Sequence, residues 1–168
     1  MLKTAVCPLQ WKVWPASLVA ALAFSATLSI AQAPAVSLKT PAQIGALEAS
    51  LRQQAAAGEG LATAYLEKYP QYYTQLIVRT KSGEVEIHQQ FDEMAIVLDG
   101  NATIFTGGTA QNPRVLRPGE LRASTAPGGT PATMAKGTVI YIPVDTPHQV
   151  IVPAGGFIAY IDVKIAHR

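Results

Sequence analysis

The feature that most constrains the fold is a series of short strand-like segments that begins at Tyr72 and continues to Ile165. Each segment is rich in β-branched, aromatic or other apolar residues, and turn residues separate it from the next. The expected strands are residues 72–80, 84–89, 94–98, 102–105, 138–142, 148–152 and 157–165. The pair Asp99-Gly100 is typical of a tight hairpin turn. Many short strands with regular turns predict an all-β sandwich or barrel.

Residues 109–135 break this pattern, because Pro, Gly, Thr and Ser dominate their composition. A short strand around Leu116 or Leu121 is expected there, and the remainder is expected to be loop. No repeat at solenoid spacing is visible in the chain, which argues against a repeat architecture.

A helix is expected before the strands, within an N-terminal helical segment at residues 34–71. Thr40 as N-cap and Pro41 at the first helical position predict where this helix begins. Three apolar residues then recur at helical spacing: Ile44, Leu47 and Leu51. Residues 58–60, Gly-Glu-Gly, predict where it ends.

A second, short helix is expected at residues 61–68. Leu61, Tyr65 and Leu66 would lie on one side of it, and Pro70 would stop it. The two helices are expected to cover one end or edge of the barrel domain, which is expected at residues 72–168.

The start of the chain has the pattern of a secretory signal peptide at residues 1–33. Lys3 and Lys12 precede an uncharged apolar run, and small residues suited to cleavage follow it at Ala31 and Ala33. An uncleaved membrane anchor is the alternative, because the run has about the ~18–20 residues that a spanning helix needs. The many alanines and serines in the run favour cleavage and a periplasmic or secreted protein.

Cleavage would remove Cys7, the single cysteine of the chain, so the mature protein would have no disulfide and no thiolate ligand. Basic residues would fall from 13 to 11 against 11 acidic residues, because Lys3 and Lys12 are lost. A formal charge of zero gives no field that would bind nucleic acid or an anionic membrane. The remaining ~135 residues suit one domain with a full core.

Two strand-like segments each bring a histidine next to a turn. In the first, His88 and Gln90 are two residues apart on a predicted strand and should share a face, and Glu93 follows after a corner. In the second, Pro147 fixes the approach to His148. Two imidazoles, a carboxylate and an amide form a ligand set for one divalent transition metal. The alternative for each histidine is a structural role, at a sheet surface or in a loop.

The first segment resembles the first of two signature motifs of the cupins, a superfamily of small jelly-roll barrels. That motif has Gly, five residues, His-x-His, three or four residues, Glu, six residues and Gly. Glu93, six residues and Gly100 match it. With His88 taken as the first histidine, Gln90 stands nearest to the second, and the chain from there to Glu93 is one residue short.

The second segment resembles the second cupin motif, which has Gly, five residues, Pro-x-Gly, two residues, His, three residues and Asn. Gly137, Pro143 and His148 match it. Asp145 stands in the place of the glycine, and Val152 in the place of the asparagine. The resemblance covers the chain from Tyr72 to Ile165.

This resemblance implies a double-stranded β-helix (jelly-roll) barrel with one or two N-terminal helices. It implies a degenerate metal site of two histidines, one carboxylate and one amide, formed by His88, Gln90, Glu93 and His148. The ion would be Fe, Mn, Zn or Ni, and the activity that of a small-molecule oxygenase, isomerase or lyase. A metal-free barrel that binds a sugar or another small ligand is the alternative. A homodimer is expected in either case.

Further polar residues alternate along the last strand. Tyr160, Asp162 and Lys164 share one face of it. The side chain of Arg79, on another predicted strand, could likewise face the interior or the exterior of the barrel. We expect this face to be the solvated exterior, although an interior position would bring the side chains to a substrate. His167 lies in the tail, and no role is expected for it.

Overall fold

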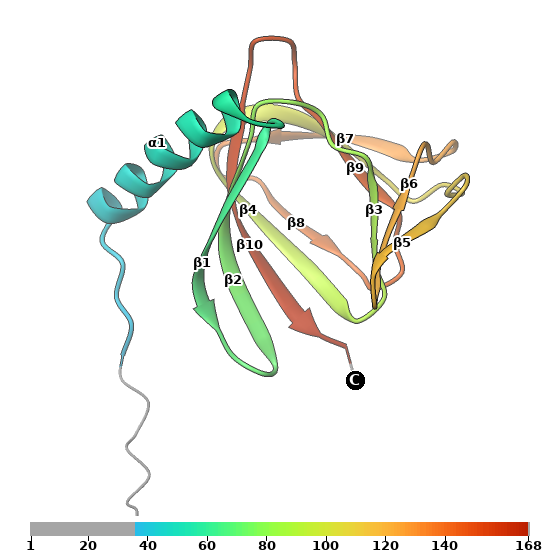
Figure 1. The fold of residues 1–168 in the computed structure, drawn as a ribbon, viewed down its shortest axis with the longest axis horizontal. Coiled ribbons are helices and arrows are strands. Elements are labelled where there is room, and N and C mark those ends of the chain that lie inside the picture. Colours follow the sequence, from blue (N-terminus) through green and yellow to red (C-terminus); the bar gives the residue numbers. More distant parts are fainter. Residues whose placement is uncertain (1–35, 168) are drawn as a thin grey trace, which may run out of the picture. The chain divides into compact units, whose positions relative to one another are not determined.

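A computed structural model describes residues 36–167 of the chain (Figure 1). The predicted signal peptide at residues 1–33 lies outside the described residues. The structure confirms the predicted fold class, an all-β jelly-roll barrel with one N-terminal helix. Within residues 36–167, no helix is both long enough and apolar enough to cross a membrane.

The helix and strands follow one another along the chain in this order: α1 (Pro41–Ala57), β1 (Leu61–Lys68), β2 (Tyr72–Arg79), β3 (Val85–His88), β4 (Phe91–Thr106), β5 (Arg114–Arg117), β6 (Glu120–Ala123), β7 (Thr130–Ala135), β8 (Val139–Ile142), β9 (His148–Ile151) and β10 (Ile158–Ala166). One sheet has the order β1-β2-β10-β4-β8, and the other has the order β5-β6-β3-β9-β4-β7. Every pairing is antiparallel. The sheets share β4, and together they curl around one interior (Figure 1).

The helix α1 begins where the sequence predicts. The Thr40 hydroxyl accepts a hydrogen bond from the Gln43 backbone N–H, and the Gln43 side chain accepts one from the Thr40 N–H at 2.9 Å. This reciprocal capping box satisfies two N–H groups at the start of the helix. Leu51 and Ala55 are buried against a cluster that includes Leu76 on the outer face of β2. The helix therefore covers the outer side of the sheet near its β1–β2 edge.

Residues 61–68 are a strand, so the prediction of a second helix is wrong. Ala62 and Ala64 pack in the cluster under α1, whereas Thr63 and Tyr65 line the interior cavity. This alternation has the period of two that a strand requires. The apolar spacing of the segment fits both periods, and pairing with β2 along its whole length decides in favour of the strand.

The pair Asp99-Gly100 does not form a hairpin turn, because β4 runs through it without interruption. Gly100 has a φ of +75°, and the register against β10 shifts at this point. The Asn101 N–H also donates to the Phe157 carbonyl at 3.0 Å, which holds the chain on its course. The pair is thus a bulge that redirects β4 from one sheet into the other.

Residues 109–135 contain more structure than expected. Leu116 lies in β5 and Leu121 in β6, so both candidate positions are in strands. A third strand, β7, pairs with the second half of β4.

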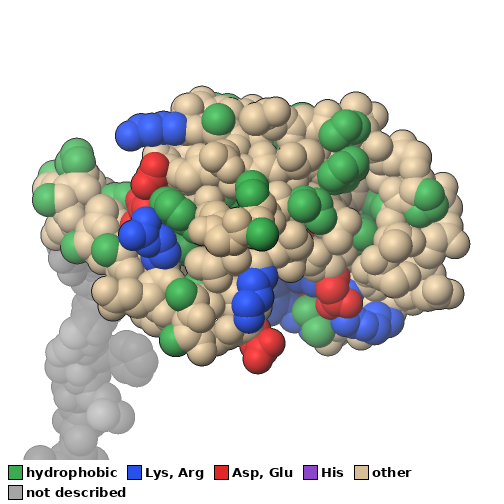
Figure 2. Space-filling view, turned by 90° about the horizontal axis from the view of Figure 1, so that it is seen from above, with side chains coloured by type: hydrophobic (Ala, Val, Ile, Leu, Met, Phe, Trp, Pro, Cys, Tyr) green, Lys and Arg blue, Asp and Glu red, His purple; other side chains and the backbone are tan. Residues whose placement is uncertain are grey.

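Figure 2 shows that lysines and arginines on the face it views lie beside acidic side chains, without a continuous basic patch.

Gly100→Ala is expected to destabilise the barrel more than Gly107→Ala. Both glycines have positive φ, at +75° and +79°, so each variant loses about 1–2 kcal/mol through backbone strain. A Cβ at Gly100 would lie 2.2 Å from the Phe157 carbonyl oxygen, whereas one at Gly107 would meet nothing within 4 Å. The clash should cost Gly100→Ala about 1–3 kcal/mol more. Urea unfolding followed by circular dichroism measures both, and equal losses would show that the bulge is not tightly packed.

Candidate metal centre

Two neighbouring strands and the start of a third bring His88, His148 and Glu93 together inside the barrel. His88 ends β3, His148 begins β9 beside it, and their ring centroids are 5.0 Å apart. Glu93 enters from β4. Its Oε2 is 3.1 Å from His88 Nε2 and 3.3 Å from His148 Nε2. All three side chains are buried, so three of the four predicted ligands converge on one point.

Both imidazoles are held through their other ring nitrogen. His88 Nδ1 lies 2.7 Å from a Glu120 carboxylate oxygen, and His148 Nδ1 lies 3.0 Å from the Thr146 carbonyl. Each of these acceptors requires Nδ1 to carry the proton, which leaves Nε2 free to offer a lone pair to a metal. His88 Nε2 is buried without a hydrogen-bond partner among the described residues, although it faces Glu93.

The separations of these atoms fit a shared ion. Two ligands that bind one metal at ~2.0–2.2 Å lie roughly 3.0–3.4 Å apart in tetrahedral or octahedral geometry. The two distances from Glu93 Oε2 to the imidazole nitrogens fall in this range. A carboxylate and two oriented imidazoles therefore have the chemistry and the spacing of a site for a divalent transition metal.

Protons compete for the same atoms. Burial lowers the pKa of His88, but the hydrogen bond to Glu120 and the Glu93 carboxylate 3.1 Å from Nε2 outweigh burial and raise the pKa to about 9. Burial also raises the pKa of Glu93, but the Lys164 ammonium and the two imidazoles hold it well below its usual range. Without a metal, His88 is therefore an imidazolium between two carboxylates at neutral pH.

Gln90 does not join the other three residues. The strand β3 ends at His88, so Gln90 lies in the bend that follows and does not share the face of His88 as predicted. Its side chain is exposed. A Cβ added to Gly119 would come within 2.9 Å of Gln90 side-chain atoms, which places the amide against the β5–β6 turn.

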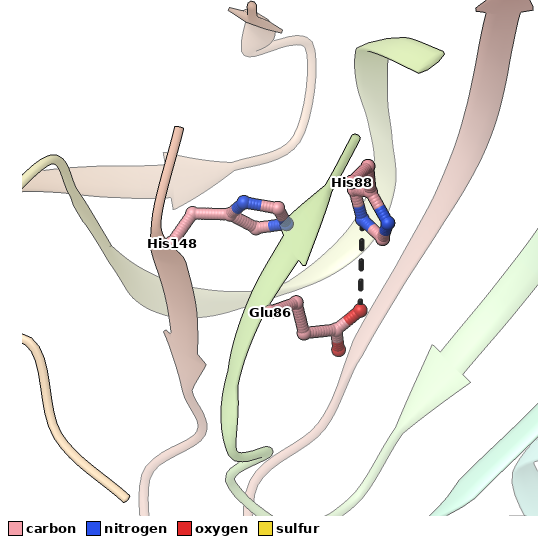
Figure 3. Close-up of side chains that lie close together, drawn as sticks. All are labelled: Glu86, His88 and His148. Atoms are coloured by element: carbon pink, nitrogen blue, oxygen red, sulfur yellow. Dashed lines mark ion pairs between the residues drawn. The ribbon is translucent and has the colours of Figure 1, made fainter. Parts of the chain in front are cut away.

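Glu86 lies at the site instead, although it is not among the ligands predicted from the sequence. Glu86 and His88 are two residues apart on β3, and Glu86 Oε2 is 3.8 Å from His88 Nε2 (Figure 3). The side-chain ligand atoms of Glu86, His88 and His148 lie within 4.8 Å of one another. With Glu86 in the place of the first motif histidine and His88 in the second, four residues separate His88 from Glu93, as the motif requires. That spacing was the signal that could have identified Glu86.

Two arginines already bind the Glu86 carboxylate. Arg79 forms an ion pair with Glu86, and Arg122 Nη2 lies 3.3 Å from Glu86 Oε2. Burial raises the pKa of Glu86, but the two guanidinium groups outweigh it and lower the pKa below its usual value. Gly83 keeps room for this arrangement, since a Cβ there would lie 2.5 Å from Arg79 Nη1. Glu86 is thus further from the convergence point than Glu93 and already has cationic partners.

The polar face of β10 points into the barrel, so the prediction that it is solvated is wrong. Tyr160, Asp162 and Lys164 are 3%, 0% and 4% exposed. The opposite face of the strand is taken by residues such as Ala159 and Ile161, which pack in the cluster under α1. Alternation alone could not say which face is covered, and the position of α1 decides it.

Lys164 and Asp162 complete the charge network of the interior. The Lys164 ammonium forms an ion pair with Glu93 and lies 3.9 Å from Asp162 Oδ2. Gln75 donates to the same Asp162 oxygen at 2.7 Å, while Asp162 Oδ1 has no hydrogen-bond partner in the part of the chain that the structure describes. Burial and the nearby Glu93 charge raise the pKa of Asp162 to about 7, against the opposing effect of Lys164.

Backbone contacts tie the loops of the two motifs together. Asp145, which replaces the motif glycine, has a φ of +61°, and its N–H donates to the His88 carbonyl at 2.8 Å. Aspartate tolerates this left-handed conformation better than most residues, so the substitution preserves the turn. Asp92 accepts a hydrogen bond from the Val144 N–H at 2.8 Å. The exposed His167 ring lies 3.3 Å from Asp92, away from the convergence point.

The convergence point lies in a cavity of about 210 Å³. The strands β1, β2, β4 and β10 line one side, and β3, β6 and β9 line the other. The volume is smaller than the ~300–1,000 Å³ of sites for drug-sized ligands. The cavity therefore suits a small polar molecule.

No family model and no curated protein match this chain. Solved structures similar to it include a cupin-2 domain protein from Rhodospirillum rubrum, at 15% identity and a TM-score of 0.47, over 65% of this chain and 62% of that one. KdgF from a Halomonas species has 13% identity and a TM-score of 0.48, over 66% and 84%. A putative mannose-6-phosphate isomerase from Ralstonia eutropha has 15% identity and a TM-score of 0.48, over 66% and 88%.

Proposed function

We propose that this chain is a secreted cupin that binds one divalent transition metal through His88, Glu93 and His148, and that it is an enzyme for a small polar substrate. One observation carries the proposal: the two Nε2 atoms meet Glu93 Oε2 at 3.1 and 3.3 Å while each Nδ1 is held by an acceptor. Histidines that bind metals are commonly oriented in this way.

The groups around the site favour a reaction that moves a proton. A bound metal would polarise a substrate oxygen as a Lewis acid. Asp162 lines the same cavity, its Oδ1 has no hydrogen-bond partner among residues 36–167, and its pKa of about 7 lets the carboxyl group accept or donate a proton near neutral pH. Lys164 keeps Glu93 ionised. Among the activities of cupins, these groups support an isomerase or a lyase more directly than an oxygenase.

Metal analysis of the purified protein tests the proposal. We expect one divalent ion per chain after incubation with Fe²⁺, Mn²⁺, Zn²⁺ or Ni²⁺ and removal of the excess. Isothermal titration should give a stoichiometry of one for at least one of these ions. Binding of none of the four would overturn the proposal.

Metal affinity is expected to rise with pH. The metal needs a neutral Nε2 on His88, and the pKa of about 9 means that this nitrogen is protonated at lower pH. Each bound ion then releases one proton, so affinity should increase about tenfold per pH unit from roughly pH 6 to 8 and level off above the pKa of His88. Competition titrations with a chelator at several pH values measure the slope. A flat profile would contradict the proton competition, and His167→Ala should leave the slope unchanged.

A metal-free binding barrel is the second candidate, and the cations of the interior favour it. Lys164 already neutralises Glu93, and Arg79 and Arg122 already neutralise Glu86. Such a protein would hold a sugar or another small ligand without catalysis. A thermal-shift screen separates the two candidates, because this one predicts stabilisation by sugars and none by divalent ions.

The localisation of the protein and its oligomeric state are also part of the proposal. The charged start and apolar run of residues 1–33 support export to the periplasm or the medium. The cupin resemblance supports a homodimer. The balanced charge of the mature chain supports a small-molecule ligand, with no nucleic acid and no membrane as partner.

A further inference from the structure

A groove of about 370 Å³ lies at the mouth of the metal cavity. We call it the rim groove and define it by five of its lining residues: Tyr65, Lys68, Tyr69, Tyr73 and Arg117. Tyr65, Tyr73 and Arg117 also line the metal cavity, so the two spaces adjoin. One ligand can therefore contact residues of both spaces.

Aromatic rings dominate the rim groove and are open to solvent. Tyr65 is 55% exposed and Tyr69 is 39% exposed. The Tyr65 and Tyr73 rings meet edge to face at 5.5 Å, which fixes their orientation. Exposed aromatic rings that other rings hold in place offer flat apolar surfaces to the ring of a ligand.

The charges of the rim groove differ from those of the cavity. Three cations that line the cavity have carboxylate partners: Arg79 and Arg122 bind Glu86, and Lys164 binds Glu93. At the rim, Arg117 and Lys68 have no carboxylate partner among residues 36–167. The Lys68 ammonium lies 4.8 Å from the centre of the Tyr65 ring, so charge and aromatic surface are presented together.

Among the described residues, Glu120 is the one acidic residue that lines the rim groove, and its carboxylate already has partners. It is 6% exposed, lies 2.7 Å from His88 Nδ1 and 3.5 Å from Arg122 Nη1. The unpaired charge at the mouth is therefore positive. Guanidinium and ammonium groups at such a position select a carboxylate.

We propose that the rim groove binds a ring that carries a carboxylate, with the ring against the tyrosines and the carboxylate on Arg117 and Lys68. The neutral polar end of the same molecule then enters the cavity. This inference names the substrate class of the proposed enzyme. It rests on the proposed function only in treating the bound molecule as a substrate. A sugar acid and an aromatic acid share the required chemistry.

Titration of the purified protein with D-glucuronate and with benzoate tests the proposal, with D-glucose and benzyl alcohol as neutral counterparts. We expect at least one acid to bind saturably and at least about tenfold more tightly than its neutral counterpart, because a charge-assisted hydrogen bond is lost. The acid that binds shows whether the ring of the ligand is a sugar ring or an aromatic ring. Binding of neither acid, or equal binding of acid and counterpart, would overturn the proposal.

Matched variants locate the binding site. Arg117→Gln should weaken acid binding about tenfold or more, whereas Arg114→Gln should not, because Arg114 on the same strand is paired with Glu84 at 2.7 Å. Tyr69→Ala should weaken it too, and Tyr141→Ala, at an exposed tyrosine on β8, should not. Equal losses in a variant and its control would place the binding elsewhere.

The two proposals fail separately. His148→Ala should lose the metal and keep the acid, since His148 does not line the rim groove and, unlike His88, is not the partner of Glu120. Metal binding without acid binding would remove the rim proposal alone. Acid binding that disappears in Arg117→Gln, in a protein that binds no metal, would remove the metal proposal alone.

Discussion

Replacing His148 by alanine is expected to abolish stoichiometric binding of divalent metal. The substitution removes one of the two imidazole nitrogens that face Glu93, at 3.3 Å from its Oε2. Changes to groups that merely orient metal ligands cost about 10–100-fold in affinity, so loss of a ligand itself should cost at least about a hundredfold. Isothermal titration with Zn²⁺ or Mn²⁺ measures the change. His88→Ala should have a similar effect through the other nitrogen.

Gln90→Ala is the matched control for this result. Gln90 belongs to the same motif segment as His88, yet its exposed amide lies against Gly119, away from the convergence point. Its replacement should leave metal affinity within about a factor of two, since no ligand is lost. A loss of binding in Gln90→Ala, with binding retained in His148→Ala, would contradict the arrangement of the site. Circular dichroism should confirm that both variants keep the fold.

The sequence predicted most of the fold because local signals were strong. The capping residues around Thr40 fix the start of α1, and the seven expected strand segments fall in six strands, since residues 94–98 and 102–105 both belong to β4. The prediction of a helix at residues 61–68 was wrong because a short apolar segment fits both helical and strand spacing, and pairing with β2 makes it a strand. The prediction of a hairpin turn at Asp99-Gly100 was wrong because β4 pairs with β10 on both sides of the bulge. Both failures lie where tertiary contacts override local preference.

The sequence predicted three of the residues that meet at the candidate site, but not the residues that set their charge. Motif spacing identified His88, Glu93 and His148, since fixed turns place these residues at one mouth. The partners that set their charge come from strands distant in sequence, such as Lys164 on β10. Which face of β10 points inward depends on where α1 packs, and no local pattern contains that information.

Lys164→Met is expected to destabilise the metal-free protein by about 3 kcal/mol. The variant leaves the Glu93 carboxylate buried without its ammonium partner, and removing one member of a buried pair typically costs about 3–5 kcal/mol. The lower end is expected, because His88 and His148 still face Glu93 at 3.1 and 3.3 Å. Lys136→Met is the control, since Lys136 is exposed and should lose at most about 0.5 kcal/mol. Urea unfolding in the presence of a chelator measures both variants.

A bound metal should recover much of this loss. The ion supplies the positive charge that Lys164 supplied, so Lys164→Met should bind the metal more tightly than the unaltered protein does. By linkage, saturating metal then stabilises the variant more than the unaltered protein. Lys164 and the metal would thus be competing counter-ions for one buried carboxylate. Equal stabilisation of both proteins by metal would show that the ion binds without contact to Glu93.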